Sequence, residues 1–209
     1  MDADAVEIRI LGCMIEKQRT TPDVYPLSLN ALRLACNQST NRDPVVDYDE
    51  DTIRGGLQRL VQRGWARLAS GPGSRAVKYR HLLDEALSLS DAQLALLGVL
   101  MLRGAQTPGE LKARTDRLHP FASLGEIHET LDGLVERELV ARLPRRPGQK
   151  EERYLQLLGG DDAAAAEVAV APAAAPAAPS DLEARVARLE DEVASLREAL
   201  GQRDVPSEA

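Results

Sequence analysis

The feature that most constrains the fold is a pattern of helix, turn and strand that occurs twice. A helix with apolar positions at helical spacing begins its stripe at Ile53, and a matching stripe begins 74 residues later at Ile127. A strand around Tyr79 recurs 75 residues later around Tyr154. This nearly constant offset predicts one structural module present twice. The matching apolar positions are Ile53, Leu57, Leu60 and Val61 in the first copy and Ile127, Leu131, Leu134 and Val135 in the second.

In both copies the helix is followed by two short strands joined by a Gly- and Pro-containing turn, which is the second half of a winged helix-turn-helix. Capping residues predict two further helices ahead of it in each copy. We therefore expect a mainly α structure with small β-hairpins (α+β), made of two tandem winged helix-turn-helix modules. Module 1 is residues 1–82 and module 2 is residues 83–158. The predicted helix starts are Ser28 and Asp49 in module 1, and Ser90, Thr107 and Ser123 in module 2.

The C-terminal part has a different composition. Residues 159–180 consist largely of Ala and Pro, which predicts a linker. Residues 181–201 carry apolar residues in alternating steps of four and three, which predicts a short coiled-coil helix. Val at one seam position and Leu at the other favours a parallel homodimer. A lone amphipathic helix that folds back on the body is the alternative. The seam residues are Leu182, Val186, Leu189, Val193, Leu196 and Leu200.

The net charge of −7 comes entirely from the C-terminal part. Residues 159–209 hold eleven acidic side chains and four arginines, whereas residues 1–158 hold 22 of each sign. A strongly basic domain is a usual mark of nucleic-acid binding, and this chain has none. Any such binding must depend on a local patch.

Module 1 contains such a patch. Residues 52–81 carry seven basic side chains and no acidic one, and the exposed face of the third helix is predicted to present Gln58, Arg59 and Gln62. Gln and Arg can contact base edges, and Arg also binds phosphates. Gly55 lies on this face and suggests a close approach of another surface. The alternative is a solvated helix face. The predicted duplex-DNA contacts are Arg42, Thr52, Arg54, Gln58, Arg59, Gln62, Arg63, Arg75 and Lys78, the last two flanking the hairpin tip.

A polar string, NQSTNRDP at residues 37–44, precedes the third helix. It can donate hydrogen bonds to phosphates. Equally, it can be a turn held by its own Asn, Ser and Asp side chains.

The corresponding helix of module 2 has the opposite charge. Its exposed face is predicted to present Glu129, Asp132 and Glu136. This face would repel DNA, so we expect either a solvated acidic surface or a surface that binds a protein partner.

Catalytic motifs are missing from the sequence. His81, His119 and His128 are scattered, without a partner at metal-ligand spacing, and no phosphate loop or nucleophile motif occurs. We expect a non-enzymatic protein without cofactor or metal. Cys13 and Cys36 are predicted to be small buried core residues, with a disulfide or a metal pair as the minority alternative.

The sequence has no apolar run of transmembrane length and no recognisable signal peptide, so we expect a cytoplasmic protein without membrane contact.

Several strings resemble the YceH-like family of bacterial tandem winged-helix proteins. They are LGCMIEK at residues 11–17, YPLSLNAL at residues 25–32 and ACNQSTNRDPV at residues 35–45. The resemblance covers about residues 5–158. It implies the tandem winged-helix fold and lends no activity.

The sequence therefore favours a homodimeric regulator that binds duplex DNA through the third helix and hairpin of module 1. The rival hypothesis is an assembly adaptor that uses the tandem body to bind protein and does not bind DNA. Salt-dependent binding to duplex DNA separates the two.

Overall fold

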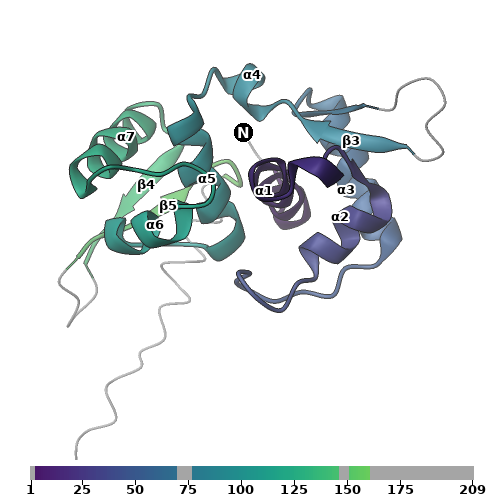
Figure 1. Ribbon diagram of the computed structural model, residues 1–209, viewed down its shortest axis with the longest axis horizontal. Helices are drawn as coiled ribbons and strands as arrows, with labels where there is room; N and C mark the ends of the chain where they lie inside the picture. The colour runs from purple at the N-terminus through teal and green to yellow at the C-terminus, as the bar shows by residue number, and fades with distance from the viewer. Residues whose placement is uncertain (1–2, 70–76, 146–150, 161–209) are drawn as a thin grey trace, which may run out of the picture. The chain divides into compact units, whose positions relative to one another are not determined.

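The computed structural model describes residues 3–69, 77–145 and 151–160, which belong to one compact unit spanning Met1–Glu167. Short helices and small antiparallel sheets make this a mixed α+β structure, as predicted (Figure 1). The predicted coiled coil and all but the first two residues of the predicted linker lie outside the described residues.

In its described residues, module 1 contains three α-helices and three short strands. The order of its elements is the one expected for a helix-turn-helix followed by a hairpin. A single turn of 3-10 helix, Pro22–Val24, and the two-residue strand β1 were not predicted. The elements are α1 (Ala5–Thr20), β1 (Leu27–Ser28), α2 (Leu29–Cys36), α3 (Glu50–Gln62), β2 (Ala66–Leu68) and β3 (Lys78–His81).

Module 2 repeats this order. A short helix, α4 (Leu83–Leu87), connects the two modules and was also not predicted. The position corresponding to β1 is a single bridge between Gln106 and Tyr154. The elements are α5 (Asp91–Arg103), α6 (Pro108–Thr115), α7 (Leu124–Glu136), β4 (Val140–Leu143) and β5 (Arg153–Gln156).

The predicted helix starts are confirmed by their hydrogen bonds. Ser90 and Gln93 form a capping box at the start of α5, and Thr107 and Glu110 form one at the start of α6. Asp49 caps α3 by accepting a hydrogen bond from the Thr52 backbone N–H. Each cap pairs a backbone N–H group that a helix leaves without an intrahelical partner.

The sheet of module 1 has the strand order β1-β3-β2, all antiparallel. Tyr79 at its centre is paired with Leu27 on one side and Leu68 on the other. Side chains alternate between the two faces of a strand. One face therefore carries Ala66 and His81, which are buried, and the other carries Arg67 and Arg80.

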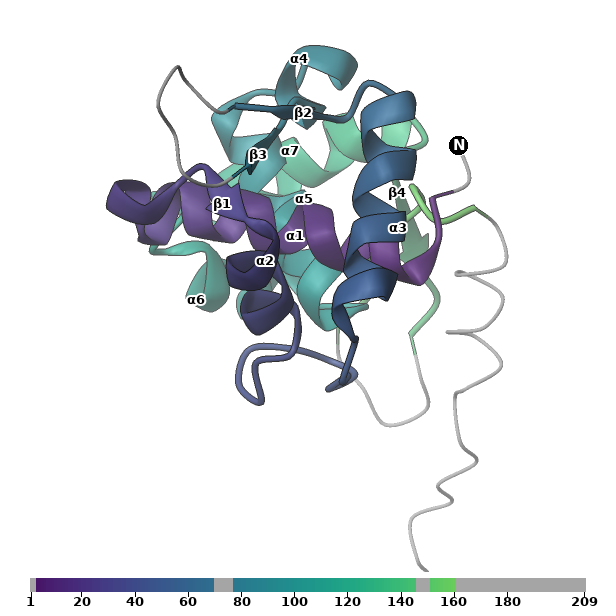
Figure 2. The same ribbon diagram turned by 90° about the vertical axis from the view of Figure 1, so that its right-hand side faces the viewer.

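The two modules share one hydrophobic core, in which α1 lies against α5 (Figures 1 and 2). Glycines make this close approach possible from both sides. A Cβ on Gly12 would lie 2.9 Å from the Leu102 side chain, and one on Gly98 would lie 2.9 Å from the Ile15 Cγ2. Such distances leave no room for a side chain, so the packing of α1 on α5 fixes the two modules relative to each other.

Candidate nucleic-acid interface

Helix α3 has the orientation that its apolar stripe predicts. Ile53, Leu57 and Leu60 are fully buried, whereas Gln58 and Gln62 are exposed. Arg54, Arg59 and Arg63 are also exposed, and Thr52 is half-buried. Figure 2 looks onto the side of the molecule that carries α2, α3 and the hairpin. The sequence therefore predicted correctly which α3 side chains reach solvent.

The N-terminal end of α3 is acidic, because acidic residues lie directly before the acid-free stretch 52–81. Asp47, Asp49, Glu50 and Asp51 lie within or just before its first turn. The Arg54 guanidinium binds both Glu50, at 2.5 Å, and Asp51. Negative charge at this end would repel phosphates, so Thr52 and Arg54 are poorly placed for a DNA contact.

Two further arginines, Arg59 of α3 and Arg63 directly after it, pair with acidic residues at the start of α1. Arg59 binds Asp4, the residue that caps α1, and its Nε lies 3.6 Å from the Glu7 Oε2. The Arg63 Nε lies 3.6 Å from the Glu7 Oε1. Asp4 is half-exposed, whereas the Glu7 side chain is only 2% exposed. The basic face of α3 is thus largely compensated from within the chain.

The Arg42 side chain is 0% exposed, contrary to the prediction that it contacts DNA. Its five N–H groups all donate to neighbours: Nε to the Ala35 carbonyl, and the remaining four to Glu16, Gln38 and the Asn41 carbonyl. The Glu16 carboxylate receives two of these bonds. Burial raises the pKa of that carboxyl, but the hydrogen bonds and charge of Arg42 outweigh burial and lower it. Arg42 therefore has a structural role.

The polar string at residues 37–44 is held by its own side chains. The Asn37 amide bonds to both the backbone N–H and the carbonyl of Tyr48, and Gln38 accepts from Arg42. The Asp43 N–H donates to the Leu102 carbonyl of α5. These contacts favour the turn over the phosphate-binding alternative.

The two glycines of α3 differ in their surroundings. Within the described structure a Cβ on Gly55 would meet only the Arg59 Nη1 within 4 Å, at 3.4 Å, so the expected approach of another surface to this open position stays a prediction. Gly56 is the crowded one, because a Cβ there would lie 2.8 Å from Ile10 and 2.9 Å from Val6. The close approach is therefore between α3 and α1.

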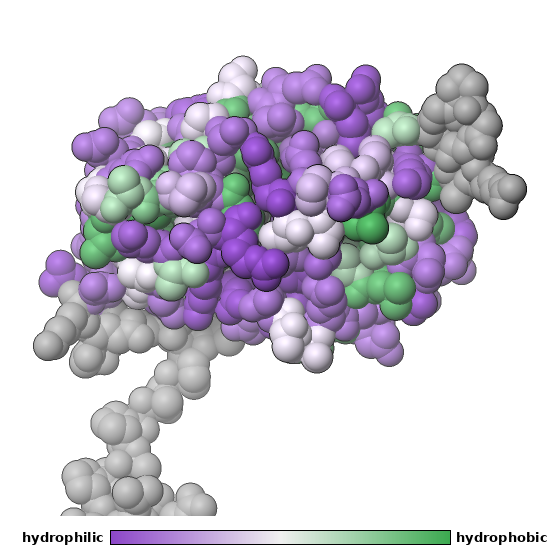
Figure 3. Space-filling view, in the orientation of Figure 1, coloured by the Kyte–Doolittle hydropathy of each residue, from purple (hydrophilic) through white to green (hydrophobic). Residues whose placement is uncertain are grey.

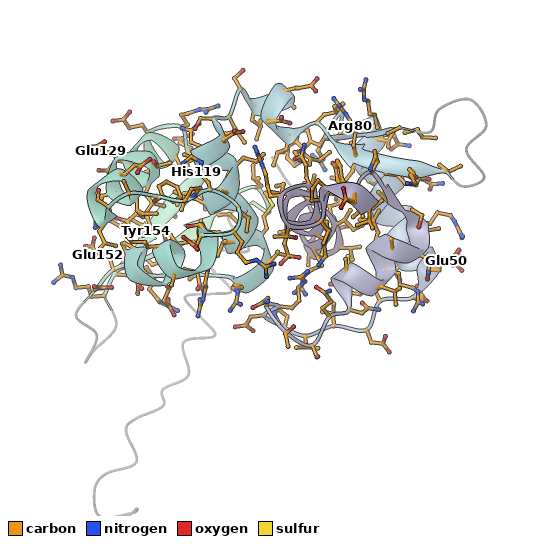
Figure 4. All side chains as sticks on the ribbon, in the orientation of Figure 1. Glu50, Arg80, His119, Glu129, Glu152 and Tyr154 are labelled. Atoms are coloured by element: carbon orange, nitrogen blue, oxygen red, sulfur yellow. The ribbon has the colours of Figure 1, made fainter. Side chains whose placement is uncertain are left out.

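Among the described residues, the outer face of the module 1 sheet carries three basic side chains. Arg67 of β2 lies directly opposite Arg80 of β3, and Lys78 lies two residues before Arg80 on the same face. Arg80 binds Glu85 at 2.5 Å, and its Nε is buried without a hydrogen-bond partner among the described residues. Figure 4 shows Arg80 on the hairpin side of the molecule. Arg75 lies outside the described residues.

The α7 face of module 2 is acidic, as predicted. Glu129, Asp132 and Glu136 are exposed, and Figure 4 shows Glu129 and Glu152 on the side of the molecule away from Arg80. Arg142 binds Asp132 at 2.7 Å and lies 3.7 Å from Glu152. The positive charge of Arg142 beside this face is therefore neutralised.

Cys13 and Cys36 are free and fully buried, as the sequence predicted for core residues. The neighbouring Cys13 thiol, together with burial, raises the pKa of Cys36. Among the described residues, no group of three or more His, Cys, Asp or Glu side chains is placed to hold a metal ion. Within those same residues no helix has the length and apolar character needed to cross a membrane.

Comparison with known proteins identifies the family. Residues 3–149 match the family model described as a protein of unknown function, DUF480. The chain is 45% identical to UPF0502 protein Ent638_1581 of Enterobacter sp. (strain 638) over 203 residues, which cover 94% of this chain and 93% of that one. It is 44% identical, with the same coverage, to UPF0502 protein YceH of Salmonella typhimurium. The resemblance to the YceH-like family is thereby confirmed, and the chain belongs to the DUF480 family.

Proposed function

We propose that this protein binds duplex DNA through module 1 and acts as a regulator rather than an enzyme. The contact surface consists of the outer face of hairpin β2–β3 and the C-terminal half of α3. The observation that carries the proposal is the pairing of Arg67 with Arg80 across the two strands.

Like charges directly opposite each other destabilise a sheet, because their Cβ atoms are only about 5 Å apart. Glu85 offsets part of this repulsion at Arg80, and Arg67, the central residue of β2, is the more exposed of the two. A phosphate placed over this face would be attracted by Arg67, Lys78 and Arg80 together. Neutralising phosphates and releasing their counterions supplies most of the affinity for DNA.

The exposed face of α3 supplies groups that can distinguish bases. Gln58 and Gln62 lie one turn apart, and Gln pairs with adenine in the major groove. Arg59 lies beside them, with its side chain 45% exposed. Ion pairs at such exposure contribute about 1 kcal/mol or less, so a phosphate can replace the Asp4 carboxylate. The acidic first turn of α3 would repel the phosphates of the DNA backbone, so the N-terminal end of the helix would lie away from them.

Fluorescence anisotropy with a labelled duplex of about 25 base pairs tests the proposal, at several salt concentrations. Log affinity should fall linearly with log salt, and the variant Arg67→Gln/Arg80→Gln should bind several-fold more weakly with a slope reduced by about two. Arg142→Gln/Arg145→Gln removes the same charge from the hairpin of module 2 and should bind like the parent protein. An equal loss of DNA affinity in both variants would contradict the assignment of the contact surface to module 1. No binding at low salt would contradict the proposal that the protein binds DNA.

The adaptor hypothesis is favoured by one feature of module 2. Leu124, 45% exposed, begins α7 beside a cavity of about 160 Å³ that is also lined by Pro108, His128 and Tyr154. An apolar side chain next to an acidic helix face suits a basic, amphipathic protein segment. Salt-insensitive capture of such a segment without DNA binding would support this second function.

A further inference from the structure

A second basic cluster lies where the two modules meet. A cavity of about 280 Å³ opens between the C-terminal end of α1, the end of α5, and α6 with the turn that follows it. Arg103, Arg114 and Arg117 line it, and Val99, Leu102 and Leu118 provide apolar surface. Figure 3 shows strongly hydrophilic side chains gathered over this seam between the modules.

The positive charge of this cavity is only partly compensated. Glu16 is the one carboxylate among the described lining residues, and it already accepts two hydrogen bonds from Arg42. Arg103 donates to the side chain of Asn41, which is neutral. Arg114 has the half-exposed Glu110, which also lines an adjacent cavity, at 3.3 Å one turn earlier on α6. Among the described lining residues there are thus three guanidinium groups and one carboxylate. That carboxylate, Glu16, is already bound to Arg42.

The arginines also influence each other. Burial lowers the pKa of Arg103, and the positive charges of Arg114 and Arg42 lower it further. Guanidinium groups stay charged in proteins, so this repulsion acts in the folded state. An anion between the arginines would remove it, because guanidinium groups form paired, charge-assisted hydrogen bonds with phosphate and carboxylate.

A neighbouring cavity of about 350 Å³ shares Arg103 and Arg114. It also contains the buried Gln106, whose Nε2 donates to the carbonyls of Arg103 and Ala105. These bonds fix the orientation of the amide, and its Oε1 is left without a hydrogen-bond partner in the described structure. Asp43 lines the same cavity. This second compartment is suited to an N–H or O–H donor, and a buried acceptor without a donor is costly.

We propose that this junction binds a small organic anion, with its phosphate or carboxylate group among Arg103, Arg114 and Arg117 and a hydrogen-bond donor near Gln106. The ligand would contact both modules, since Asn41 and Glu16 belong to module 1 and the arginines to module 2. This site is separate from the hairpin face and does not depend on the proposed binding of DNA.

Isothermal titration of the full chain with inorganic pyrophosphate and with citrate, at constant ionic strength, tests the site and separates phosphate from carboxylate ligands. At least one probe should bind saturably at one site per chain. Arg114→Gln/Arg117→Gln should weaken binding about tenfold or more, because each charge-assisted bond contributes about 1.5–3 kcal/mol. Arg114→Lys/Arg117→Lys keeps the charge and should retain part of the affinity.

Arg142→Gln/Arg145→Gln, with the same loss of charge elsewhere in module 2, should bind the probes like the parent protein. Thermal melting without ligand should show Arg114→Gln/Arg117→Gln to be folded. Unchanged affinity in that variant, or equal weakening in the control, would overturn the proposal. Loss of duplex-DNA binding with no effect on either small anion would instead assign the arginines to the nucleic-acid surface, and would equally overturn it.

Discussion

Gly56 of α3 lies against Ile10 of α1 so closely that a Cβ on the glycine would be 2.8 Å from the Ile10 Cδ1. Ile10 is fully buried, so it has little room to move. Gly55, the preceding residue, faces the far end of the flexible Arg59 side chain at 3.4 Å. Gly56 therefore has no room for a side chain, whereas Gly55 has room for at least a methyl group.

The change Gly56→Ala should destabilise the protein by about 1–3 kcal/mol, because it overpacks the contact between α3 and α1. Gly55→Ala should stabilise it by up to about 1 kcal/mol, because alanine is the better helix former. Urea unfolding of the two variants measures both effects. Equal effects of the two changes would show that α3 does not pack on α1 as described.

The ion pair of Arg42 with Glu16 should be essential for folding stability. Glu16→Gln leaves the enclosed guanidinium without its carboxylate, which should cost about 3–5 kcal/mol. Arg54→Gln removes an exposed arginine that also binds two carboxylates, and should cost less than about 1 kcal/mol. Chemical denaturation gives both values. A small loss in Glu16→Gln would mean that water enters this part of the core.

Local signals explain what the sequence could predict. The capping boxes of α5 and α6 join residues three positions apart, and the exposed face of α3 follows from the spacing of Ile53, Leu57 and Leu60. Such features depend on neighbouring residues in one helix, so periodicity is enough to find them. For the same reason the acidic face of α7 could be recognised.

The partners of the arginines could not be predicted in this way. Asp4 is 55 residues from Arg59, and Glu16 is 26 residues from Arg42. Both ion pairs depend on how α1 packs against the rest of module 1. A pattern of neighbouring residues does not predict such long-range contacts. The strand β1 was missed for a related reason, because its two residues are defined only by pairing with β3.

His81 should make stability depend on pH in mildly acidic solution. Burial lowers its pKa from 6.5 to about 4, against the opposing effect of Asp84. As pH falls below 6.5 the unfolded chain gains a proton that the folded chain does not, so stability present above pH 6.5 is lost progressively down to about pH 4. Between pH 7 and pH 5 the loss should be about 2 kcal/mol.

His81→Phe should show a smaller loss of stability over this interval, even if it is less stable at pH 7 because the bond to Gln18 is removed. Denaturant unfolding at pH 7, 6 and 5 measures the slope. The interval lies above the usual range of Asp and Glu, so those groups contribute little to it. The same slope in both proteins would place the titrating group elsewhere.

The heptad pattern of residues 182–200 predicts a parallel dimer. In that arrangement Arg185 faces Glu190 of the other chain, and Glu192 faces Arg197, so both flanking contacts are attractive. The seam is shorter than three heptads, so association should be weak and should depend on concentration.

Sedimentation of the full chain and of a truncation after Gly160 measures this association. The truncation keeps Leu158, whose carbonyl accepts a hydrogen bond from the Ala3 N–H. The full chain should dimerise as its concentration rises, and the truncation should remain monomeric. Monomers throughout would exclude the dimer, and a dimer that survives truncation would place the interface in the two modules.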